Sequence, residues 1–382
     1  MNDDMKRGAN FTVALLQNLL RNINNHYGKD NWDSFSFGPC PSSLKKTLIK
    51  YVNKLLAIRG MTIIPINNDG YVQELEKFHS VLHDLPSIYA RMDDPYSKSI
   101  LVDIIAYRIL GCRKVKLPLS REKNWFKQRS FVNKMINIGR SIKIEFNNWT
   151  LNCFDLSPIG FPIKVFGTPD GILVTYILKQ YEYRKDKTDI GAKSGDYVID
   201  AGGCWGDTSL FFAHQVNAEG KVFTFEFNPT NIEIMRENLT LNPELKHRID
   251  IIQRPLWEKS DVSRFSRDNG PATYLTEEET ENSDMRISTL TIDDFVKANA
   301  IPKVNFIKMD IEGTELSALK GAVTTLKKWR PKLAIAVYHR LDDLVEIPNF
   351  LSALNFGYKF YLDHFTIHSG ETILFCSASE KQ

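Results

Sequence analysis

The chain has 382 residues, of which 43% are hydrophobic and 25% are charged, and its formal net charge is +3 at pH 7. This balance is typical of a soluble globular protein. No apolar run approaches the roughly 20 residues that a helix needs to cross a bilayer, so we expect no membrane span. The length is sufficient for two domains of ordinary size.

The charge is distributed unevenly along the chain. Residues 1–190 contain 28 Lys and Arg against 18 Asp and Glu, whereas residues 191–382 contain 21 against 28. We therefore expect the basic N-terminal half and the acidic C-terminal half to have different roles.

The cysteines and the N-terminus indicate a cytoplasmic protein. The five cysteines are scattered, odd in number and without a Cys-x-x-Cys pair, which favours neither a disulfide framework nor a zinc site. Residues 1–20 carry acids where a signal peptide has basic residues, and Gln17 and Asn18 interrupt the apolar stretch. We therefore expect no secretory signal.

The first part of the chain is predicted to be mainly helical. Apolar residues recur at helical spacing in four stretches, which are residues 10–26, 42–58, 71–92 and 97–110. We interpret residues 1–140 as a mainly helical domain that binds a substrate or a partner. Residues 141–190 form a second part, in which 141–166 predict short antiparallel strands, followed by a connecting helix.

Residues 191–382 alternate between strands and helices. Strands are predicted at Tyr197–Asp200, Lys221–Phe227, Ile249–Gln253, Val304–Asp310 and Lys332–His339. Helices are predicted at Thr208–Gln215, Pro229–Leu241, Glu315–Leu326 and Ile347–Leu354. This alternation predicts an α/β fold with a mostly parallel sheet and helices on both faces. Two final strands, on either side of His368-Ser369-Gly370, predict an antiparallel hairpin at the end of the chain.

One segment interrupts this alternation. Residues 254–288 are polar and contain the acidic run EEETENSD at Glu277–Asp284. The segment is long for a loop, so we expect it to be functional or mobile, with the acidic run exposed to solvent.

The sequence VIDAGGCWGDTSLFF, residues 198–212, places three glycines directly after the first strand of this half. Glycines there let backbone amides approach a ligand at the carboxyl edge of the sheet. Their spacing does not fit Gly-x-Gly-x-x-Gly, and Asp200 before the turn is unfavourable for a pyrophosphate. A carboxylate instead suits a cationic ligand such as S-adenosylmethionine. Glu226, which follows the second strand, is placed to hold the ribose of this ligand. The alternative is a structural turn with both acids on a solvated rim.

Four segments follow one another in the order VIDAGGCWGDTSL, FEFNP, STLTIDDFV and FIKMDIEGTELSALKGA. Together they resemble the FkbM family of S-adenosylmethionine-dependent methyltransferases, over about residues 160–376. The resemblance is most specific at KMDIEGTE followed by LKGA. The turn departs from the commonest family form, Gly-Ala-Asn-x-Gly, because Gly203, Cys204 and Trp205 stand at its centre. It resembles a subgroup with Gly-Gly-Cys-Trp-Gly-Asp-Thr.

The resemblance implies a class I methyltransferase fold, which is Rossmann-like, with S-adenosylmethionine as the cofactor. Asp200, Gly202 and Gly206 are expected to border the methionine end of the cofactor. The other residues of the turn that are expected to bind it are Gly203, Trp205, Asp207 and Thr208. The residues expected at its ribose and adenine are Glu226, Phe227, Asn228 and Trp257. Asp207 and Thr208 are also candidates for capping the helix that they open. Leu256 is expected to pack in the core.

Methyl transfer to a hydroxyl requires an aligned nucleophile and a group that removes its proton. The catalytic candidates, which lie at or after strand ends, are Asp310, Glu312 and His339. His339 is favoured as the base because a neutral imidazole suits this task, and Asp310 is the next candidate. Glu312 alternatively stabilises the N-terminus of the next helix. We expect no metal, because Asp342 and Asp343 are interpreted as the start of a helix rather than as a ligand pair.

The expected function is O-methylation of a hydroxyl on a sugar, a glycan or a secondary metabolite. Ten Lys and Arg lie between Arg113 and Lys143, with Trp125 and Phe126 among them. This run favours an anionic or sugar-bearing substrate, and the alternative is a solvated surface. Four residues before the first core strand are candidates for covering the cofactor: Tyr176, Gln180, Tyr181 and Tyr183.

Two other functions are considered. The first is a non-catalytic protein of the same fold that binds a nucleotide-sugar or a partner enzyme. The intact Asp200, Glu226, Asp310 and His339 favour the enzyme. The second is nucleic-acid methylation, which is less favoured because the strand ends carry no Lys-Asp-Lys-Glu pattern.

Overall fold

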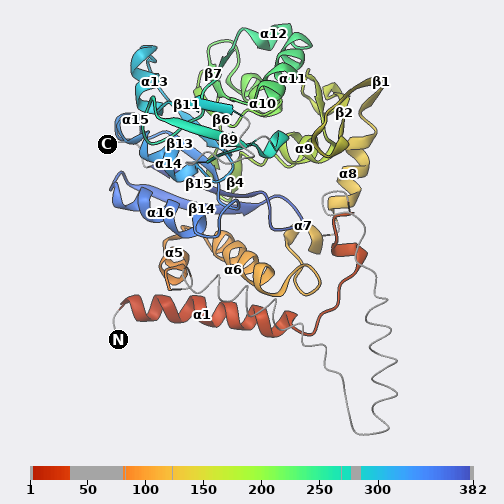
Figure 1. Cartoon of the computed structure of the whole chain (residues 1–382). Coiled ribbons are helices and arrows are strands. Elements are labelled where there is room, and N and C mark those ends of the chain that lie inside the picture. The colour runs from red at the N-terminus through yellow and green to blue at the C-terminus, as the bar shows by residue number, and fades with distance from the viewer. Residues whose placement is uncertain are drawn as a thin grey trace.

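A seven-stranded sheet lies at the centre of the protein (Figure 1). The computed structural model describes residues 3–34, 81, 83–122, 124–267, 269–276 and 285–378. The strands of the sheet are β6 (Tyr197–Ala201), β7 (Lys221–Phe225), β8 (Ile249–Ile252), β12 (Phe306–Met309), β13 (Lys332–Ala336), β14 (Tyr358–His364) and β15 (Thr372–Ala378). They are arranged in the order β14-β15-β13-β12-β6-β7-β8.

The direction of the strands confirms the predicted sheet. The five strands from β13 to β8 are parallel, and β15 is antiparallel to both β13 and β14. Counted along the chain, the parallel strands follow the order 3-2-1-4-5 of doubly wound folds. The structure therefore has the Rossmann-like class I methyltransferase fold, with the expected C-terminal antiparallel hairpin.

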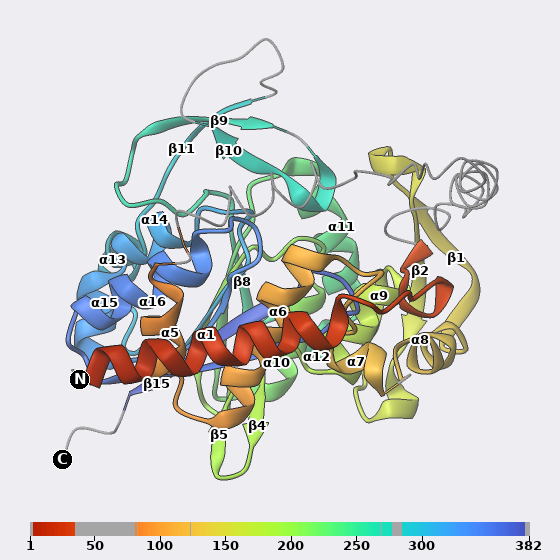
Figure 2. The ribbon, with the colours of Figure 1, turned by 90° about the horizontal axis from the view of Figure 1, so that it is seen from below.

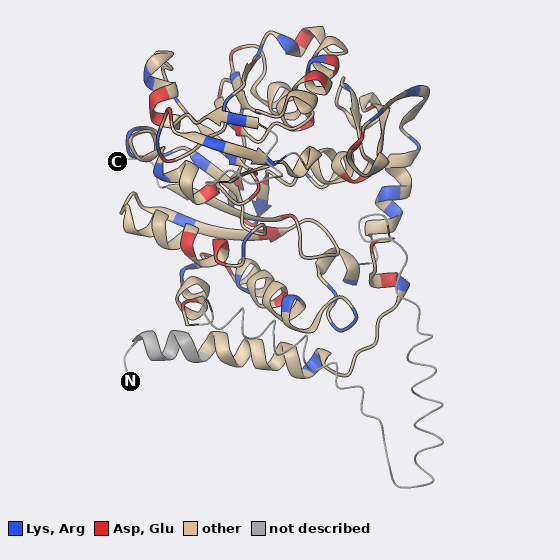
Figure 3. Cartoon of the chain, viewed as in Figure 1, with Lys and Arg blue, Asp and Glu red and all other residues tan. Residues whose placement is uncertain are grey.

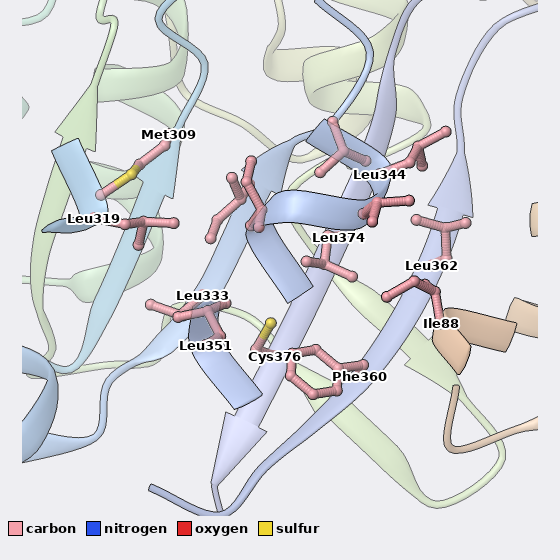
Figure 4. Packing of buried hydrophobic residues seen from close by; sticks show 14 of the residues in the cluster. Ile88, Met309, Leu319, Leu333, Leu344, Leu351, Phe360, Leu362, Leu374 and Cys376 are labelled. Atoms are coloured by element: carbon pink, nitrogen blue, oxygen red, sulfur yellow. The ribbon is translucent and has the colours of Figure 1, made fainter. Parts of the chain in front are cut away.

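Helices cover both faces of the sheet because successive strand residues point to opposite sides. Ile199 packs into one hydrophobic cluster, whereas the preceding Val198 packs into the other. The first face carries α5 (Leu85–Arg91), α6 (Pro95–Leu110), α13 (Ile292–Ala298), α14 (Glu315–Lys320), α15 (Val323–Trp329) and α16 (Asp343–Ala353). The second carries α9 (Pro169–Ile172), a π-helical turn at Leu173–Ile177, α10 (Asp207–Val216), α11 (Pro229–Thr240) and α12 (Pro243–Lys246). Figure 4 shows Leu351 of α16 beside Leu333 of β13 on the first face.

The N-terminal region is helical where it is described. Helix α1 (Asp3–Asn22) packs on α5 and α6 (Figure 2). Helix α6 in turn packs on β14 (Figure 1). The side chain of Asp94 caps α6 by accepting a hydrogen bond of 2.7 Å from the Ser97 amide. The predicted helix at 42–58 lies outside the described residues, as does half of the one at 71–92. The division of the chain at residues 140 and 190 stays a prediction.

The expected short strands at 141–166 are present. Strands β1 (Ile136–Lys143), β2 (Thr150–Asp155) and β3 (Lys164–Gly167) form an antiparallel sheet. Short elements beside it are α7 (Pro118–Arg121), α8 (Trp125–Asn133), β4 (Tyr183–Lys185) and β5 (Thr188–Ile190). Cys153 of β2 and Phe166 of β3 share a hydrophobic cluster with Trp205, so this sheet is packed against the glycine turn.

In the C-terminal half the structure contains three strands that were not predicted, and one predicted helix was wrong. The segment 254–288 contains strands β9 (Ser263–Arg267), β10 (Tyr274–Thr276) and β11 (Met285–Ser288), which form an antiparallel sheet in the order β10-β9-β11. These strands are short and polar, so they lack the apolar pattern that predicts a strand. The single helix expected at Glu315–Leu326 is interrupted at Gly321, where a Cβ atom would lie 2.3 Å from the Trp257 carbonyl oxygen. The acidic run at Glu277–Asp284 lies outside the described residues.

Candidate active site

A pocket lies at the carboxyl ends of β6, β7 and β12, where ligands bind in doubly wound folds. It is also bordered by β10 and by the turn between β14 and β15. The predicted site residues that line it are Gly202, Trp205, Asp207, Thr208, Glu226, Phe227, Asp310 and Glu312. The predicted site residues that do not line it are Asp200, Gly203, Gly206, Asn228, Trp257 and His339.

The glycine turn brings the end of β6 against the end of β12. Gly202 has a φ of +83°, and a Cβ atom on it would lie 1.9 Å from the carbonyl oxygen of Asp310. A Cβ atom on Gly203 would lie 2.1 Å from a methyl carbon of Thr224. Only glycine therefore fits both positions, because neither the backbone oxygen nor the packed methyl has room to move.

Asp200 lies behind this turn rather than on the pocket wall. Its side chain is fully buried and pairs with Lys308, whose Nζ is 3.1 Å from Oδ1. It also accepts hydrogen bonds from Thr208 Oγ1 at 2.9 Å and Ser209 Oγ at 2.7 Å. The hydroxyl of Thr208 is thus directed at Asp200, and neither Thr208 nor Asp207 provides a side-chain cap for α10.

Glu226 follows β7 and faces the pocket. Its Oε1 accepts hydrogen bonds of 2.8 Å from the amides of Phe227 and Asn228, and its Oε2 accepts one of 2.9 Å from the amide of Cys204. Burial raises the pKa of Glu226 to about 7, although these amides and Lys308 oppose the shift. Three of roughly four acceptor positions of the carboxylate are filled, so one remains for a ligand hydroxyl.

Three residues predicted to bind the cofactor make contacts with other residues of the protein. Asn228 caps α11 by accepting from the Thr230 amide at 2.9 Å, and its side-chain nitrogen donates to Thr273 at 2.8 Å. Trp257 is buried away from the pocket, with the Arg264 guanidinium 4.7 Å from its ring centre. Trp205 lines the pocket and donates to the Asn231 side chain at 3.1 Å. Leu256, which we expected only in the core, also lines the pocket.

Asp310 and Glu312 form the wall at the end of β12. The carboxylate of Asp310 accepts hydrogen bonds from Tyr181 at 2.8 Å and from Tyr338 at 3.0 Å. Glu312, at φ +57°, and Gly313, at φ +88°, make the turn that follows, and this turn directs Glu312 toward His339.

His339 lies behind these two acids. Its Nε2 is 3.3 Å from Asp310 and 3.5 Å from Glu312, and its Nδ1 is 3.0 Å from Glu315. Burial alone would lower the pKa of the imidazole, but Glu312, Glu315 and Asp310 outweigh it and raise the pKa well above its ordinary value. A protonated imidazole cannot accept a proton, so this environment is unfavourable for the general base predicted at His339. We expected no metal, yet Asp310, Glu315 and His339 can each place one ligand atom within 4.8 Å of the other two.

The pocket wall is acidic. Its described residues include five acids, which are Asp207, Glu226, Asp310, Glu312 and Glu371. Two bases, Lys308 and Arg254, also line it, but both are engaged. Lys308 pairs with Asp200, and Arg254 donates to Asp261 at 2.6 Å. No basic side chain on the described wall is therefore available for a phosphate.

Several residues of the site were missed by sequence reasoning. Lys308 is a lysine within an otherwise apolar strand, FIKM, and this position is the signal that could have found it. Glu315 opens α14, and its carboxylate also accepts from the Ile311 amide at 2.8 Å. Glu371 belongs to the β14–β15 turn and accepts from Gln180 at 3.2 Å. Burial and the charge of Asp310 raise the pKa of Glu371 to about 8. Nothing in the sequence around Glu371 indicates this contact.

The basic run from Arg113 to Lys143 lies apart from the pocket. Figure 3 shows its charged residues on α8 and β1, at the side of the molecule. Arg121 pairs with Asp103 at 2.6 Å and Arg129 with Asp170 at 2.6 Å. None of the described residues of this run lines the pocket. Of the two aromatic residues expected to contact a substrate, Trp125 is buried, whereas Phe126 is 41% exposed.

Of the four aromatic and amide residues before β6, two line the pocket, Gln180 and Tyr181. Tyr176 is buried and donates to the Asp207 carbonyl at 2.7 Å, and Tyr183 is buried against Phe375.

None of the helices in the described ranges has the length and hydropathy that a membrane crossing requires.

Comparison with known proteins finds similarity to methyltransferases, mainly in the C-terminal part of the chain. Over 137 residues it is 28% identical to the hexuronic acid methyltransferase AglP of Haloferax volcanii, which corresponds to 36% of this chain and 54% of that protein. The chain thus spans about half the length of this curated relative. The crystal structure of methyltransferase FkbM from Methylobacillus flagellatus KT aligns at 18% identity with a TM-score of 0.49, covering 86% of this chain and 70% of that one.

A fibrillarin from Aeropyrum pernix, solved with natively bound S-adenosyl-L-methionine, aligns at 12% identity with a TM-score of 0.35, covering 62% of this chain and 92% of that one. The family model described as the methyltransferase FkbM domain matches residues 189–360, slightly less than half of the chain. This match covers most of the central sheet, so residues 189–360 are similar in sequence to a methyltransferase FkbM domain.

Proposed function

We propose that the protein is an S-adenosylmethionine-dependent O-methyltransferase that acts on a hydroxyl of a sugar, a glycan or a secondary metabolite. The observation that carries the proposal is the charge of the pocket wall, which combines five acids with two bases that are already engaged. Such a wall suits a ligand with an ammonium and a sulfonium, and it is unfavourable for the pyrophosphate of a dinucleotide or a nucleotide-sugar.

The residues around the glycine turn fit this cofactor. Gly202 keeps the wall open where any side chain would collide with Asp310. Glu226 would accept a hydrogen bond from a ribose hydroxyl through its remaining acceptor position. Asp207, rather than the buried Asp200, would face the ammonium, because Asp207 lines the pocket at the start of α10. When bound, S-adenosylmethionine supplies an electrophilic methyl group on its sulfonium.

The acceptor would lie at the other end of the pocket, beside Asp310 and Glu312. Tyr181 and Tyr338 fix the carboxylate of Asp310, so it can hold an acceptor hydroxyl in one orientation. A wall of carboxylates favours a substrate with several hydroxyl donors. The similarity to AglP, a hexuronic acid methyltransferase, supports a sugar as the substrate class. We place nucleic acid below a sugar, because the basic run lies apart from this pocket.

The first test is calorimetric titration of the purified protein with S-adenosylmethionine, NAD and a nucleotide-sugar in separate experiments. We expect saturable binding of S-adenosylmethionine alone, about tenfold or more weaker in Glu226→Ala and unchanged in Glu219→Gln, which alters an exposed acid outside the pocket. Transfer of a radiolabelled methyl group to glycans then identifies the acceptor, and His339→Ala is expected to lower turnover while binding of S-adenosylmethionine persists. Binding of the nucleotide-sugar alone would refute the methyltransferase proposal and support the non-catalytic alternative.

A further inference from the structure

Glu371 is the acid that the turn between β14 and β15 adds to the pocket wall. This turn carries it to the acceptor end of the pocket, which Asp310 and Tyr338 also line. The backbone of Glu371 has a φ of +61°, a conformation that residues with a side chain rarely adopt. Its carbonyl oxygen accepts a hydrogen bond of 3.0 Å from the Phe365 amide. The turn therefore fixes the backbone from which the carboxyl reaches the pocket.

The carboxyl of Glu371 is paired with a glutamine that also lines the pocket. The Nε2 atom of Gln180 donates to Glu371 Oε2 at 3.2 Å. Gln180 is only 3% exposed, and its Oε1 has no hydrogen-bond partner among the described residues. An unpaired buried carbonyl oxygen is costly, so a hydroxyl of a bound ligand would stabilise this arrangement by donating to it.

The other two acids at this end of the pocket are engaged by their neighbours. The carboxylate of Asp310 accepts from the hydroxyls of Tyr181 and Tyr338. Glu312 lies 3.5 Å from the imidazole of His339, the pKa of which is raised well above its ordinary value. The oxygens of these two acids thus have partners on the protein, whereas the carboxyl of Glu371 is held by an amide alone in the described part of the chain.

The surroundings of Glu371 also stabilise a proton on its carboxyl. The charged and titratable groups that face it are Asp310, Glu312, His339, Tyr181 and Tyr338. Burial and the two acids raise the pKa of Glu371 to about 8, although His339 and the amide of Gln180 oppose this shift. A general base is most effective when its pKa lies near the working pH, so this carboxyl suits proton transfer from a hydroxyl.

We propose that Glu371 accepts the proton of the acceptor hydroxyl during methyl transfer, with Gln180 as the residue that positions its carboxylate. This proposal rests on the proposed function. The acceptor oxygen forms a bond to the methyl carbon while the bond from that carbon to sulfur breaks. The electron pair of the broken bond stays on sulfur, which leaves as a neutral thioether, and the hydroxyl proton passes to Glu371. The loss of one positive charge is thus balanced by the proton that the carboxylate gains.

This balance predicts that Glu371 distinguishes the cofactor from its product. A nearby cation stabilises an ionised carboxylate, so ionised Glu371 would favour the sulfonium of S-adenosylmethionine. S-adenosylhomocysteine has the same amino acid, ribose and adenine but a neutral sulfur. Contacts that the two ligands share, including that of Glu226, therefore cancel when their affinities are compared. Because Glu371 loses its proton as the pH rises, the preference for S-adenosylmethionine is expected to grow toward alkaline pH.

Calorimetric titration of the full-length protein with each of the two ligands, at pH 6 and at pH 9, tests the proposal without an acceptor. We expect the ratio of the two affinities to rise about threefold or more in the wild type relative to Glu371→Gln. The comparison of the two proteins removes the titration of the ligands' own amino groups. Glu219→Gln, at an exposed position outside the pocket, is the control and is expected to match the wild type.

Gln180→Leu is a second variant, and it keeps the carboxyl of Glu371. It removes the amide that opposes the raised pKa, so the rise in the affinity ratio should move to higher pH. Thermal unfolding of each variant shows whether the fold is retained. An acceptor found by the transfer of radiolabelled methyl groups adds a second readout. With it, Glu371→Gln is expected to lower kcat about 100-fold or more while binding of S-adenosylmethionine persists.

The outcomes separate this proposal from the proposed function. If both ligands bind but their affinity ratio changes equally with pH in the wild type, Glu371→Gln and Gln180→Leu, the proton does not belong to Glu371. Full turnover in Glu371→Gln would also overturn the proposal, and both results would leave the methyltransferase assignment standing. If neither ligand binds to the wild type, the proposed function is refuted and the role of Glu371 with it.

Discussion

Lys308 and Asp200 form a completely buried ion pair beneath the glycine turn. Lys308 Nζ lies 3.1 Å from Asp200 Oδ1, and the side-chain exposures are 1% and 0%. Lys308 also donates to the carbonyl oxygens of Ala201 at 3.1 Å and of Gly202 at 2.6 Å. The pair therefore links β12 to the turn after β6, and Asp200 acts on the pocket through the backbone that it holds in place.

Replacing one partner of this pair is expected to destabilise the fold. Lys308→Met leaves the Asp200 carboxylate buried without its cation, which costs about 3–5 kcal/mol in the free energy of unfolding. Denaturant unfolding measures this loss, with Lys297→Met, at an exposed position of α13, as the control. The double variant Asp200→Leu with Lys308→Met is expected to be less destabilised than the sum of its single variants. Additive effects would show that the two groups do not depend on each other.

The close approach at Gly202 predicts a second, separable effect. Gly202→Ala places a Cβ atom 1.9 Å from a backbone oxygen and adds the strain of a φ of +83°. Gly357→Ala has a comparable φ of +77° with no atom within 4 Å, so it isolates the strain, which is about 1–2 kcal/mol. We expect Gly202→Ala to lower the unfolding midpoint clearly more than Gly357→Ala and to abolish S-adenosylmethionine binding. Equal midpoints in the two variants would contradict the contact with Asp310.

Asp207 and Asp200 are predicted to respond differently to loss of charge. Asp207 lines the pocket, and burial raises its pKa, so Asp207→Asn removes a poorly solvated charge from the wall. We expect this variant to fold normally but to bind S-adenosylmethionine about tenfold more weakly, because a charge-assisted contact is lost. Asp200→Asn, by contrast, should lower the unfolding midpoint. Calorimetry and thermal unfolding of both variants check this, and weaker binding in Asp200→Asn alone would reverse the assignment.

The sequence predicted the central sheet because each parallel strand is a short, mainly apolar run between polar segments. VIDA of β6 contains Asp200 as its one acid, and FIKM of β12 is followed directly by Asp310, so both strands have an acid near the carboxyl edge of the sheet. The β9–β11 sheet was missed because SRFSR and MRIS carry too few apolar residues to be distinguished from a loop.

Side-chain direction was harder to predict than secondary structure. Leu256 and Trp257 are adjacent, and only Leu256 lines the pocket. Neighbouring residues in extended backbone point to opposite sides, so an error of one position reverses the assignment.

Glu371 reaches the pocket because the β14–β15 hairpin folds back beside β13, a long-range relationship that no local pattern contains. The cluster around His339 was found only in part, since Glu315 was interpreted solely as the start of a helix.

The raised pKa of Glu226 predicts how cofactor affinity depends on pH. Burial raises this pKa to about 7 in the free protein, and a ribose hydroxyl donates best to the ionised carboxylate. Below pH 7 a proton must therefore leave Glu226 on binding, whereas above it the carboxylate is already ionised. We expect the dissociation constant for S-adenosylmethionine to be about tenfold larger at pH 6 than at pH 8, by the linkage between one proton and binding.

Calorimetry at several pH values checks this expectation, and Glu226→Gln is the matched variant. Any titration of the ligand itself is common to both proteins, so the difference between them isolates Glu226. The variant is expected to bind weakly with no contribution from this group between pH 6 and 8. If the wild type and Glu226→Gln have parallel pH profiles, the proton does not belong to Glu226, and the carboxylate serves only the amides of Cys204, Phe227 and Asn228.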